Sequence, residues 1–194
     1  ESYHNHFRGN SNSYQRVIEA LKELKKYPSI FTSVVTCVTP ENIDQLESLK
    51  VLLLDDITIG SWRLYPIFPI GRASLDSSLL LQTKQLHGLL GLIKQYRESG
   101  YNVKFSCEGF LGDYEGTVRP HFYNCMAGVS VASIRVNGDI SGCNSIRYNY
   151  SEGNIYKDNL WEVWQTGFNK YRNRSWAKSD ICSKCKVFRY CLGG

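Results

Sequence analysis

Apolar residues in the first hundred positions recur at two alternating spacings, which predict helices alternating with strands. Segments with the three-to-four-residue spacing of an amphipathic helix are 13–27, the residues after Thr39-Pro40, and 79–99. Segments rich in the β-branched and aromatic residues that strands favour are 30–38, 57–67 and 103–107. The first of these strands is almost continuously apolar, so we expect helices to cover both faces of its sheet.

This order of elements predicts an α/β fold with a parallel sheet and right-handed connections. A closed barrel of eight helix-and-strand units typically takes about 250 residues. Residues 1–110 hold only two to three such units. They are therefore expected to form either a small open sheet or a part of a larger barrel.

The pattern changes after about residue 110, where glycines separate short segments and helical periodicity disappears until Asp158. We therefore place a linker at 111–124 between two domains, 1–110 and 125–194. In the second domain, Asn137-Gly138 lies between two apolar segments, which predicts a tight β-hairpin.

Ser13 in the first domain and Asp158 in the second are each expected to cap the N-terminus of a helix. The helix after Asp158 has a broad apolar face made by Leu160, Trp161, Trp164, Phe168 and Tyr171. We expect both tryptophans to lie in the core.

Five of the seven cysteines fall into two blocks with short, turn-rich spacings. The blocks are Cys125-x12-Gly138-x4-Cys143 and Cys182-x2-Cys185-x5-Cys191. The hairpin is expected to bring the first two cysteines to one end, and a loop is expected to carry the other three. Thiolates at such spacings bind zinc or iron-sulfur clusters, and both alternatives stay open at this point. Cys37 and Cys107 lie in apolar strands and are expected to be core thiols.

Composition and charge argue against several classes of function for this chain. The chain has 194 residues, of which 42% are hydrophobic, and its 23 basic and 18 acidic residues give a net charge of +5. The basic residues are dispersed, which argues against a nucleic-acid partner. The apolar stretches are far shorter than the roughly 20 residues of a membrane span. No secretory signal is recognisable, so we expect a cytoplasmic protein, and the absence of a methionine at Glu1 predicts a longer chain.

The two cysteine blocks resemble the SPASM domain, which follows the barrel in many radical S-adenosylmethionine enzymes. The pattern of that domain is Cys-x9-15-Gly-x4-Cys, a gap, and Cys-x2-Cys-x5-Cys-x3-Cys, and this sequence matches every spacing that it contains. Further similar segments are Asn154-Ile155, 160–164 and 190–194. The first half is similar, more loosely, to the end of the barrel that binds S-adenosylmethionine. The segments that carry this likeness are His6-Phe7-Arg8-Gly9, Val34-Val35-Thr36 with Asn42, and Pro69-Ile70-Gly71-Arg72-Ala73.

The resemblance implies an α/β chain made of the C-terminal portion of a partial (β/α)6 barrel, followed by a small cysteine-rich α+β iron-sulfur domain with a β-hairpin. It implies up to two auxiliary 4Fe-4S clusters. By resemblance, Cys125 and Cys143 are ligands of one cluster, and Cys182, Cys185 and Cys191 are ligands of the other. Arg8 and Arg72 become candidates for contacts to S-adenosylmethionine, the alternative being that each is solvated or ion-paired.

The sequence also departs from the family pattern. The Cys-x3-Cys-x2-Cys that holds the radical cluster is absent, and we expect it upstream of Glu1, with a further late cysteine after Gly194. Positions 126–142 contain no cysteine, which predicts an open iron on the first cluster. The chain by itself is therefore expected to be inactive.

The function implied is part of a radical S-adenosylmethionine oxidoreductase, a maturase that modifies a peptide or protein side chain through a 5′-deoxyadenosyl radical. The auxiliary clusters would aid electron transfer or substrate binding, and an electron donor such as flavodoxin or ferredoxin is an implied partner. Two alternatives stay open: a non-catalytic relative that binds a precursor peptide, and a structural zinc-binding module. No catalytic residue is assigned, because Glu108 and Asp113 suit acid-base roles only if they face the barrel mouth.

Overall fold

The computed structural model describes residues 1–105, 109–146 and 150–193. The chain divides into two compact units, and each is described by itself. The N-terminal unit comprises Glu1–Ser106 and Asp113–His121, and the C-terminal unit comprises Cys107–Gly112 and Phe122–Gly194. The segment 111–124, expected as a linker, is thus shared between the two units.

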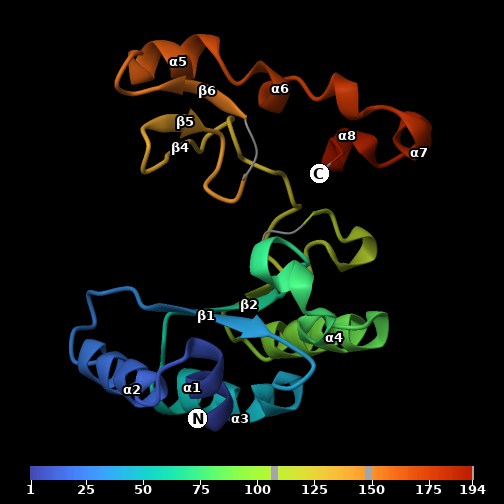
Figure 1. The fold of residues 1–194 in the computed structure, drawn as a ribbon. Coiled ribbons are helices and arrows are strands. Elements are labelled where there is room, and N and C mark those ends of the chain that lie inside the picture. The colour runs from blue at the N-terminus through green and yellow to red at the C-terminus, as the bar shows by residue number, and fades with distance from the viewer. Residues whose placement is uncertain (106–108, 147–149, 194) are drawn as a thin grey trace. The chain divides into compact units, whose positions relative to one another are not determined.

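The N-terminal unit contains helices and a small parallel sheet (Figure 1). Its α-helices are α1 (Ser2–Arg8), α2 (Ser13–Leu24), α3 (Leu46–Lys50) and α4 (Thr83–Glu98). A π-helical segment, η2 (Val51–Asp56), continues α3, and short 3-10 turns are η1 (Ile43–Gln45), η3 (Gly71–Leu75) and η4 (Ser77–Leu79). A further 3-10 turn, η5 (Gly112–Tyr114), begins in the C-terminal unit at Gly112 and continues into this one. The strands are β1 (Ser33–Val38), β2 (Ser61–Pro66) and β3 (Val103–Phe105).

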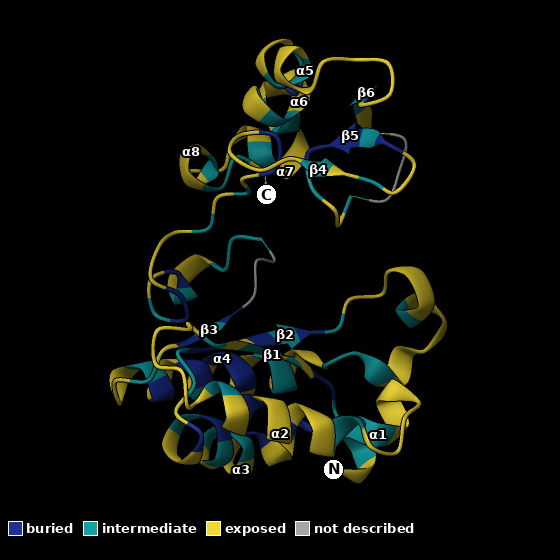
Figure 2. Ribbon diagram, turned by 90° about the vertical axis from the view of Figure 1, so that its left-hand side faces the viewer, coloured by how far each residue is buried: buried dark blue, intermediate teal, exposed yellow. Residues whose placement is uncertain are grey.

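The sheet has the order β1-β2-β3 with both pairs parallel, as the alternation of helices and strands predicts. Two views show that the four α-helices lie on the same side of this sheet (Figures 1 and 2). The three described strands form an open sheet, and the assignment of this unit to a partial barrel stays a prediction.

Burial along the strands shows that the helices cover only one face of the sheet. Successive side chains of a strand point to opposite faces, and in β1 the residues Ser33, Val35 and Cys37 are exposed. Arg63, the partner of Val35 in β2, is also exposed. The predicted cover on both faces is therefore wrong for this unit, and so is the assignment of Cys37 to the core, because an apolar strand does not reveal which face is packed. Cys107 lies outside the described residues.

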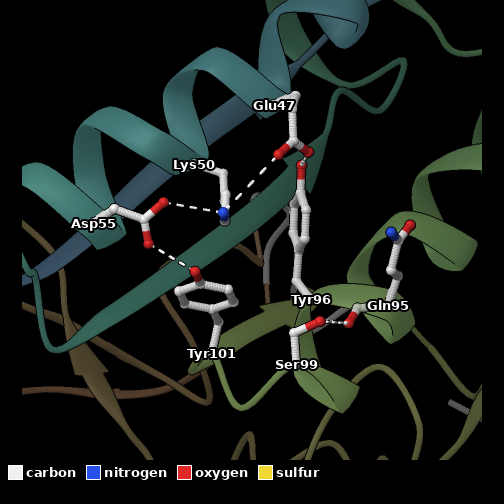
Figure 3. Close-up of polar contacts among 7 residues, drawn as sticks. All are labelled: Glu47, Lys50, Asp55, Gln95, Tyr96, Ser99 and Tyr101. Carbon is white, nitrogen blue, oxygen red and sulfur yellow. Dashed lines mark hydrogen bonds and ion pairs between the residues drawn. The ribbon is translucent and has the colours of Figure 1, made fainter.

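The covered face carries a core centred on Trp62, which is fully buried. Its indole Nε1 donates a hydrogen bond to Thr36 Oγ1 at 2.8 Å, and its ring stacks on Tyr96 of α4 with centroids 6.2 Å apart. Tyr96 in turn donates its hydroxyl to Glu47 Oε2 at 2.6 Å (Figure 3). Burial first, and then the hydrogen bond to the Glu47 carboxylate, raise the pKa of Tyr96. These contacts join the sheet to α4 and α3.

A second polar contact fastens η2 beside the same helices. Lys50 Nζ lies 3.0 Å from Asp55 Oδ2, and the Tyr101 hydroxyl donates to Asp55 Oδ1 at 2.7 Å (Figure 3). Lys50 Nζ also lies 4.7 Å from the centroid of the Tyr101 ring. The hydrogen bond from Tyr101, followed by that from Lys50, lowers the pKa of Asp55.

Two predicted element boundaries in this unit shift in the structure. Asn12 occupies the N-cap of α2, and Ser13 is the first helical residue, with its hydroxyl 3.0 Å from His4 Nε2. The second strand begins at Ser61 rather than at residue 57, because Thr58 adopts a φ of 63° and turns the chain. None of the described helices is both long and apolar enough to cross a membrane.

The C-terminal unit consists of short elements. Its strands are β4 (Ser133–Ile134), β5 (Asp139–Ser141) and β6 (Ser151–Asn154), in an antiparallel sheet of that order. Its helical segments are α5 (Leu160–Thr166), α6 (Asn169–Arg172), η6 (Ser175–Ala177), α7 (Asp180–Ser183) and α8 (Phe188–Cys191). The chain as a whole is therefore a mixed helix-and-strand protein.

The predicted hairpin is confirmed, whereas the predicted long helix is wrong. β4 and β5 pair across Asn137-Gly138, where Gly138 has a φ of 86° that suits glycine in a tight turn. The helix after Asp158 is divided into α5 and α6, because Phe168 adopts a φ of 63° between them. Asn159 rather than Asp158 caps α5, with Oδ1 accepting from the amides of Trp161 and Glu162. Trp161 is 64% exposed and is not a core residue.

Candidate metal centre

The two cysteines of the first block lie on segments that come close together at two glycines. Gly128 lies three residues after Cys125, and Gly142 directly precedes Cys143. The amide of Gly128 donates a hydrogen bond to the carbonyl of Gly142 at 3.3 Å. A Cβ on Gly142 would lie 2.9 Å from the Tyr171 ring, closer than side chains normally pack. The absence of side chains at these glycines therefore lets the two cysteine segments pack against Tyr171.

A buried aromatic residue supports these segments. Phe168 is fully buried despite its positive φ, and its amide donates to Glu152 Oε2 at 2.9 Å. Its ring lies 5.4 Å from Trp164 and 5.9 Å from Tyr171, centroid to centroid. A non-glycine residue pays a steric cost in this conformation, so the aromatic packing and the hydrogen bond must hold it.

Arg172 fastens α5 and α6 to the first cysteine block. Its Nε donates to the Gly128 carbonyl at 2.9 Å, and its two terminal nitrogens donate to the carbonyls of Trp164 and Gln165. The guanidinium carbon lies 4.9 Å from the Trp164 ring centroid. One side chain thus satisfies carbonyls near the end of α5 and holds the backbone beside Cys125.

Arg174 contacts Cys125 itself. Its Nη2 donates to the Cys125 carbonyl at 2.8 Å, and its Nε donates to the Tyr171 carbonyl at 3.0 Å. Burial raises the pKa of the Cys125 thiol, but hydrogen bonds from the Ala127 amide, Arg174 and Tyr123, together with the charge of Arg174, outweigh burial and leave this pKa lowered. The thiolate, which is the form that binds metals, is therefore favoured at Cys125.

Cys143 follows β5 in a turn. The Ser145 amide approaches its sulfur at 3.5 Å, and the Ser141 hydroxyl donates to the Cys143 carbonyl at 3.0 Å. Cys125 and Cys143 are both half-buried, and the Ser145 amide is directed at the sulfur of Cys143. Such N–H···S hydrogen bonds are among the features that set the properties of iron-sulfur clusters.

The second cysteine block, called here the late block, comprises Cys182, Cys185 and Cys191. It lies on short helical turns, not on the loop that the sequence predicts. Cys182 belongs to α7 and Cys191 ends α8, while Cys185 lies between them and is exposed. The amide of Cys185 donates to the carbonyl of Cys182 at 3.2 Å, so the Cys-x2-Cys segment forms a turn. Each described cysteine is a free thiol.

A pocket of about 210 Å³ connects the first block with the end of the late block. It is lined by Tyr123, Cys125, Lys170, Tyr171, Arg174, Trp176, Leu192 and Gly193. Leu192 and Gly193 directly follow Cys191. The fold therefore brings Cys125 near the residues after the last cysteine of the sequence, as a site shared by both blocks requires.

The five predicted ligands fit an iron-sulfur cluster by donor type but are not assembled into one set. Across 1–105, 109–146 and 150–193, no three histidine, cysteine, aspartate or glutamate side chains lie close enough together to hold a metal ion. The donors themselves are free thiols, and the sulfur of Cys143 accepts a backbone hydrogen bond from Ser145. This chemistry suits a thiolate-bound group. Which cysteines share a cluster stays a prediction.

The remaining predicted site residues lie in the N-terminal unit. Arg8 is exposed in the last turn of α1, where a cation interacts favourably with the helix dipole. Arg72 is exposed in η3, and Asp113 is exposed beside a pocket of about 110 Å³ with Lys94, Tyr114 and Thr117. The proposed contacts of both arginines to S-adenosylmethionine stay predictions. Glu108 lies outside the described residues.

Sequence reasoning did not identify Arg172 and Arg174 as parts of the site. Each is one of many dispersed basic residues, and the carbonyls that they bind at Gly128 and Cys125 lie 44 and 49 positions away. Spacing within the sequence gives no signal for such contacts. The glycines beside the cysteines offered a weak signal, because glycine in a strand-rich segment often marks close backbone approach.

Comparison with known proteins identifies the cysteine-rich region. Residues 125–186 match the family model of the SPASM iron-sulfur cluster-binding domain, a match that includes Cys125, Cys143, Cys182 and Cys185 and ends before Cys191. No curated protein matches the chain. The likeness of residues 1–110 to a radical S-adenosylmethionine barrel stays a prediction. The chain is therefore a mixed helix-and-strand protein that carries a SPASM iron-sulfur cluster-binding domain over residues 125–186.

Proposed function

We propose that the C-terminal unit holds up to two auxiliary 4Fe-4S clusters in a radical S-adenosylmethionine maturase that modifies a peptide or protein. Cys125 and Cys143 would be ligands of one cluster, and Cys182, Cys185 and Cys191 of the other. The observation that carries this proposal is the SPASM match over residues 125–186, which includes four of these five cysteines. The pocket between Cys125 and the residues after Cys191 supports it.

The residues of the chain would hold and shield the cluster ligands. Bound clusters supply one-electron transfer and, at an open iron, a site for a substrate group. The Ser145 amide donates to the Cys143 sulfur, and Arg172 fixes the backbone at Gly128, close to Cys125. The aromatic packing around Phe168 keeps this framework in place.

A structural zinc site is the second candidate, and one observation favours it. Cys182 and Cys185 form a turn with two intervening residues, the spacing found in zinc knuckles. Zinc binding would use the late block alone and would leave Cys125 and Cys143 without a metal. The metal content of the protein therefore separates the two candidates.

The deciding experiment measures iron, sulfide and zinc in the full-length protein after anaerobic reconstitution, together with its absorption spectrum. We expect roughly eight irons per chain beyond any radical cluster, with broad thiolate-to-iron absorption. Cys125→Ser and Cys185→Ser should each lower the iron content. Cys37→Ser is the matched control, because Cys37 is an exposed thiol in the other unit. About one zinc per chain without iron would refute the proposal.

The catalytic part of the proposal has a separate test. The full-length protein, reduced with dithionite, should convert S-adenosylmethionine to 5′-deoxyadenosine, and a peptide or protein substrate should increase the yield. Loaded auxiliary clusters without this conversion would indicate the non-catalytic, peptide-binding relative. Flavodoxin or ferredoxin should replace dithionite as the electron donor.

A further inference from the structure

Arg174 lies beside Cys125, where its positive charge can influence a group bound by that cysteine. Its guanidinium donates hydrogen bonds to the carbonyls of Cys125 and Tyr171, and Arg174 and Cys125 line the same pocket. These two bonds hold the planar guanidinium beside Cys125.

The charge of Arg174 is not neutralised by a carboxylate. The ion pairs found among the described residues are Lys26–Glu23, Lys50–Glu47, Lys50–Asp55, Lys94–Glu98 and Arg119–Glu115, and none includes Arg174. Of the residues that the structure describes, those lining the pocket beside Cys125 include a second cation, Lys170, and no acidic residue. An arginine stays charged at any physiological pH. A partly buried positive charge therefore lies beside Cys125.

We propose that Arg174 is a positioning residue that raises the reduction potential of the cluster bound by Cys125. This inference rests on the proposed function, since it requires a cluster at that sulfur. Reduction adds one electron to the cluster and neither forms nor breaks a bond, so the reduced form carries one more negative charge. A cation held beside a ligand residue by a hydrogen bond to its carbonyl stabilises that form more than the oxidised one. Removing the cation therefore favours the oxidised cluster.

The test is a redox titration of the full-length, reconstituted protein, with dithionite as reductant and electron paramagnetic resonance as readout. The signal that disappears in Cys125→Ser identifies the relevant cluster. Arg174→Gln should disfavour reduction of this cluster at least about tenfold, which is a fall of about 59 mV for a one-electron couple. Arg174→Lys keeps the charge but loses the planar fork, so its potential should fall between those of Arg174→Gln and the wild type.

Lys170→Gln is the matched control, because it removes the same charge from the same pocket without a hydrogen bond to Cys125. Its potential should change by less than a third of the Arg174→Gln shift. A normal iron content with unchanged potentials in both Arg174 variants overturns the inference and leaves the proposed function intact. An equal shift in Lys170→Gln also overturns it, because the effect would then belong to the pocket charge in general.

Iron content distinguishes the remaining outcomes. If the wild-type protein binds no iron, the proposed function fails and this inference fails with it. If the wild type loads but neither Arg174 variant does, Arg174 is needed only to build the site, and the potential-setting role is refuted.

Discussion

The close approach of Gly128 to α6 yields a prediction that separates steric contact from backbone strain. A Cβ at Gly128 would lie 2.7 Å from both Cβ and Cγ of Tyr171 and 2.9 Å from Cδ1 of Phe168. Neither neighbour is free to move, because Phe168 is fully buried and the Tyr171 Cβ is attached to the backbone of α6. Gly128→Ala should therefore force a shift in the packing that supports Cys125.

The expected loss has two parts. Gly128 has a φ of 65°, and a left-handed conformation costs a non-glycine residue about 1–2 kcal/mol. Overpacking a fixed site adds about 1–3 kcal/mol. Gly128→Ala should therefore lower the free energy of local unfolding by about 2–5 kcal/mol. A small unit has only a modest total stability, so this change should open much of the C-terminal unit.

Gly112→Ala is the matched control, because Gly112 has a φ of 58° in the same unit and a Cβ added there would have no atom within 4 Å. It should cost only the strain of about 1–2 kcal/mol. Hydrogen-deuterium exchange of the whole chain, followed by mass spectrometry, reports the opening free energy of peptides from 125–146 and 160–172. Peptides from α4 provide the internal reference. Equal losses in the two variants would refute the argument from close approach.

Three further predictions concern other parts of the chain. Gly88→Ala, at an exposed position within α4 with no atom near the new Cβ, should stabilise the N-terminal unit by about 0.5–1 kcal/mol, measured by urea unfolding; a loss would contradict the open surroundings. Tyr96→Phe should cost about 1–2 kcal/mol in the same assay, because the hydrogen bond to the Glu47 carboxylate is lost, and no change would show that this bond contributes nothing. In the metal-free wild type at pH 7, iodoacetamide should alkylate Cys125 faster than it does in the metal-free Arg174→Gln variant, because the lowered pKa of Cys125 leaves more thiolate in the wild type. Equal rates in the two proteins would contradict the cause assigned to this pKa. The lowered pKa of the Cys125 thiol also stabilises the folded chain. This stabilisation is fully present above the ordinary thiol pKa and is lost as the pH falls through the lowered pKa.

The helices and strands of the N-terminal unit were predictable where the apolar pattern was long and regular. The spacing over 13–27 and 79–99 corresponds to α2 and α4, and the β-branched segment 30–38 contains β1. The uncovered sheet face was not predictable, because apolar side chains at Val35 and Cys37 satisfy the rule for a buried strand while lying on the exposed face. Burial is a property of neighbours in space, which a continuous apolar segment does not reveal.

The cysteine ligand candidates were accessible from sequence, whereas the framework around them was not. Their spacing alone led to the SPASM resemblance, and the family match covers four of the five. The division between α5 and α6 contradicts a continuous apolar face, since Phe168 takes its positive φ from tertiary contacts with Glu152 and Tyr171. Tertiary packing overrides local helix propensity at this position.

The bond between Arg174 and the Cys125 carbonyl also bears on the order of events during synthesis. The two residues are 49 positions apart, so this contact forms only after the intervening hairpin and helices have left the ribosome. Closing such a loop costs chain entropy before any contact compensates for it. Cys125 is therefore among the first cysteines of the SPASM domain to be synthesised but among the last to acquire its final surroundings. A cluster at this sulfur, as proposed above, would therefore meet its final surroundings only once the chain as far as Arg174 has left the ribosome.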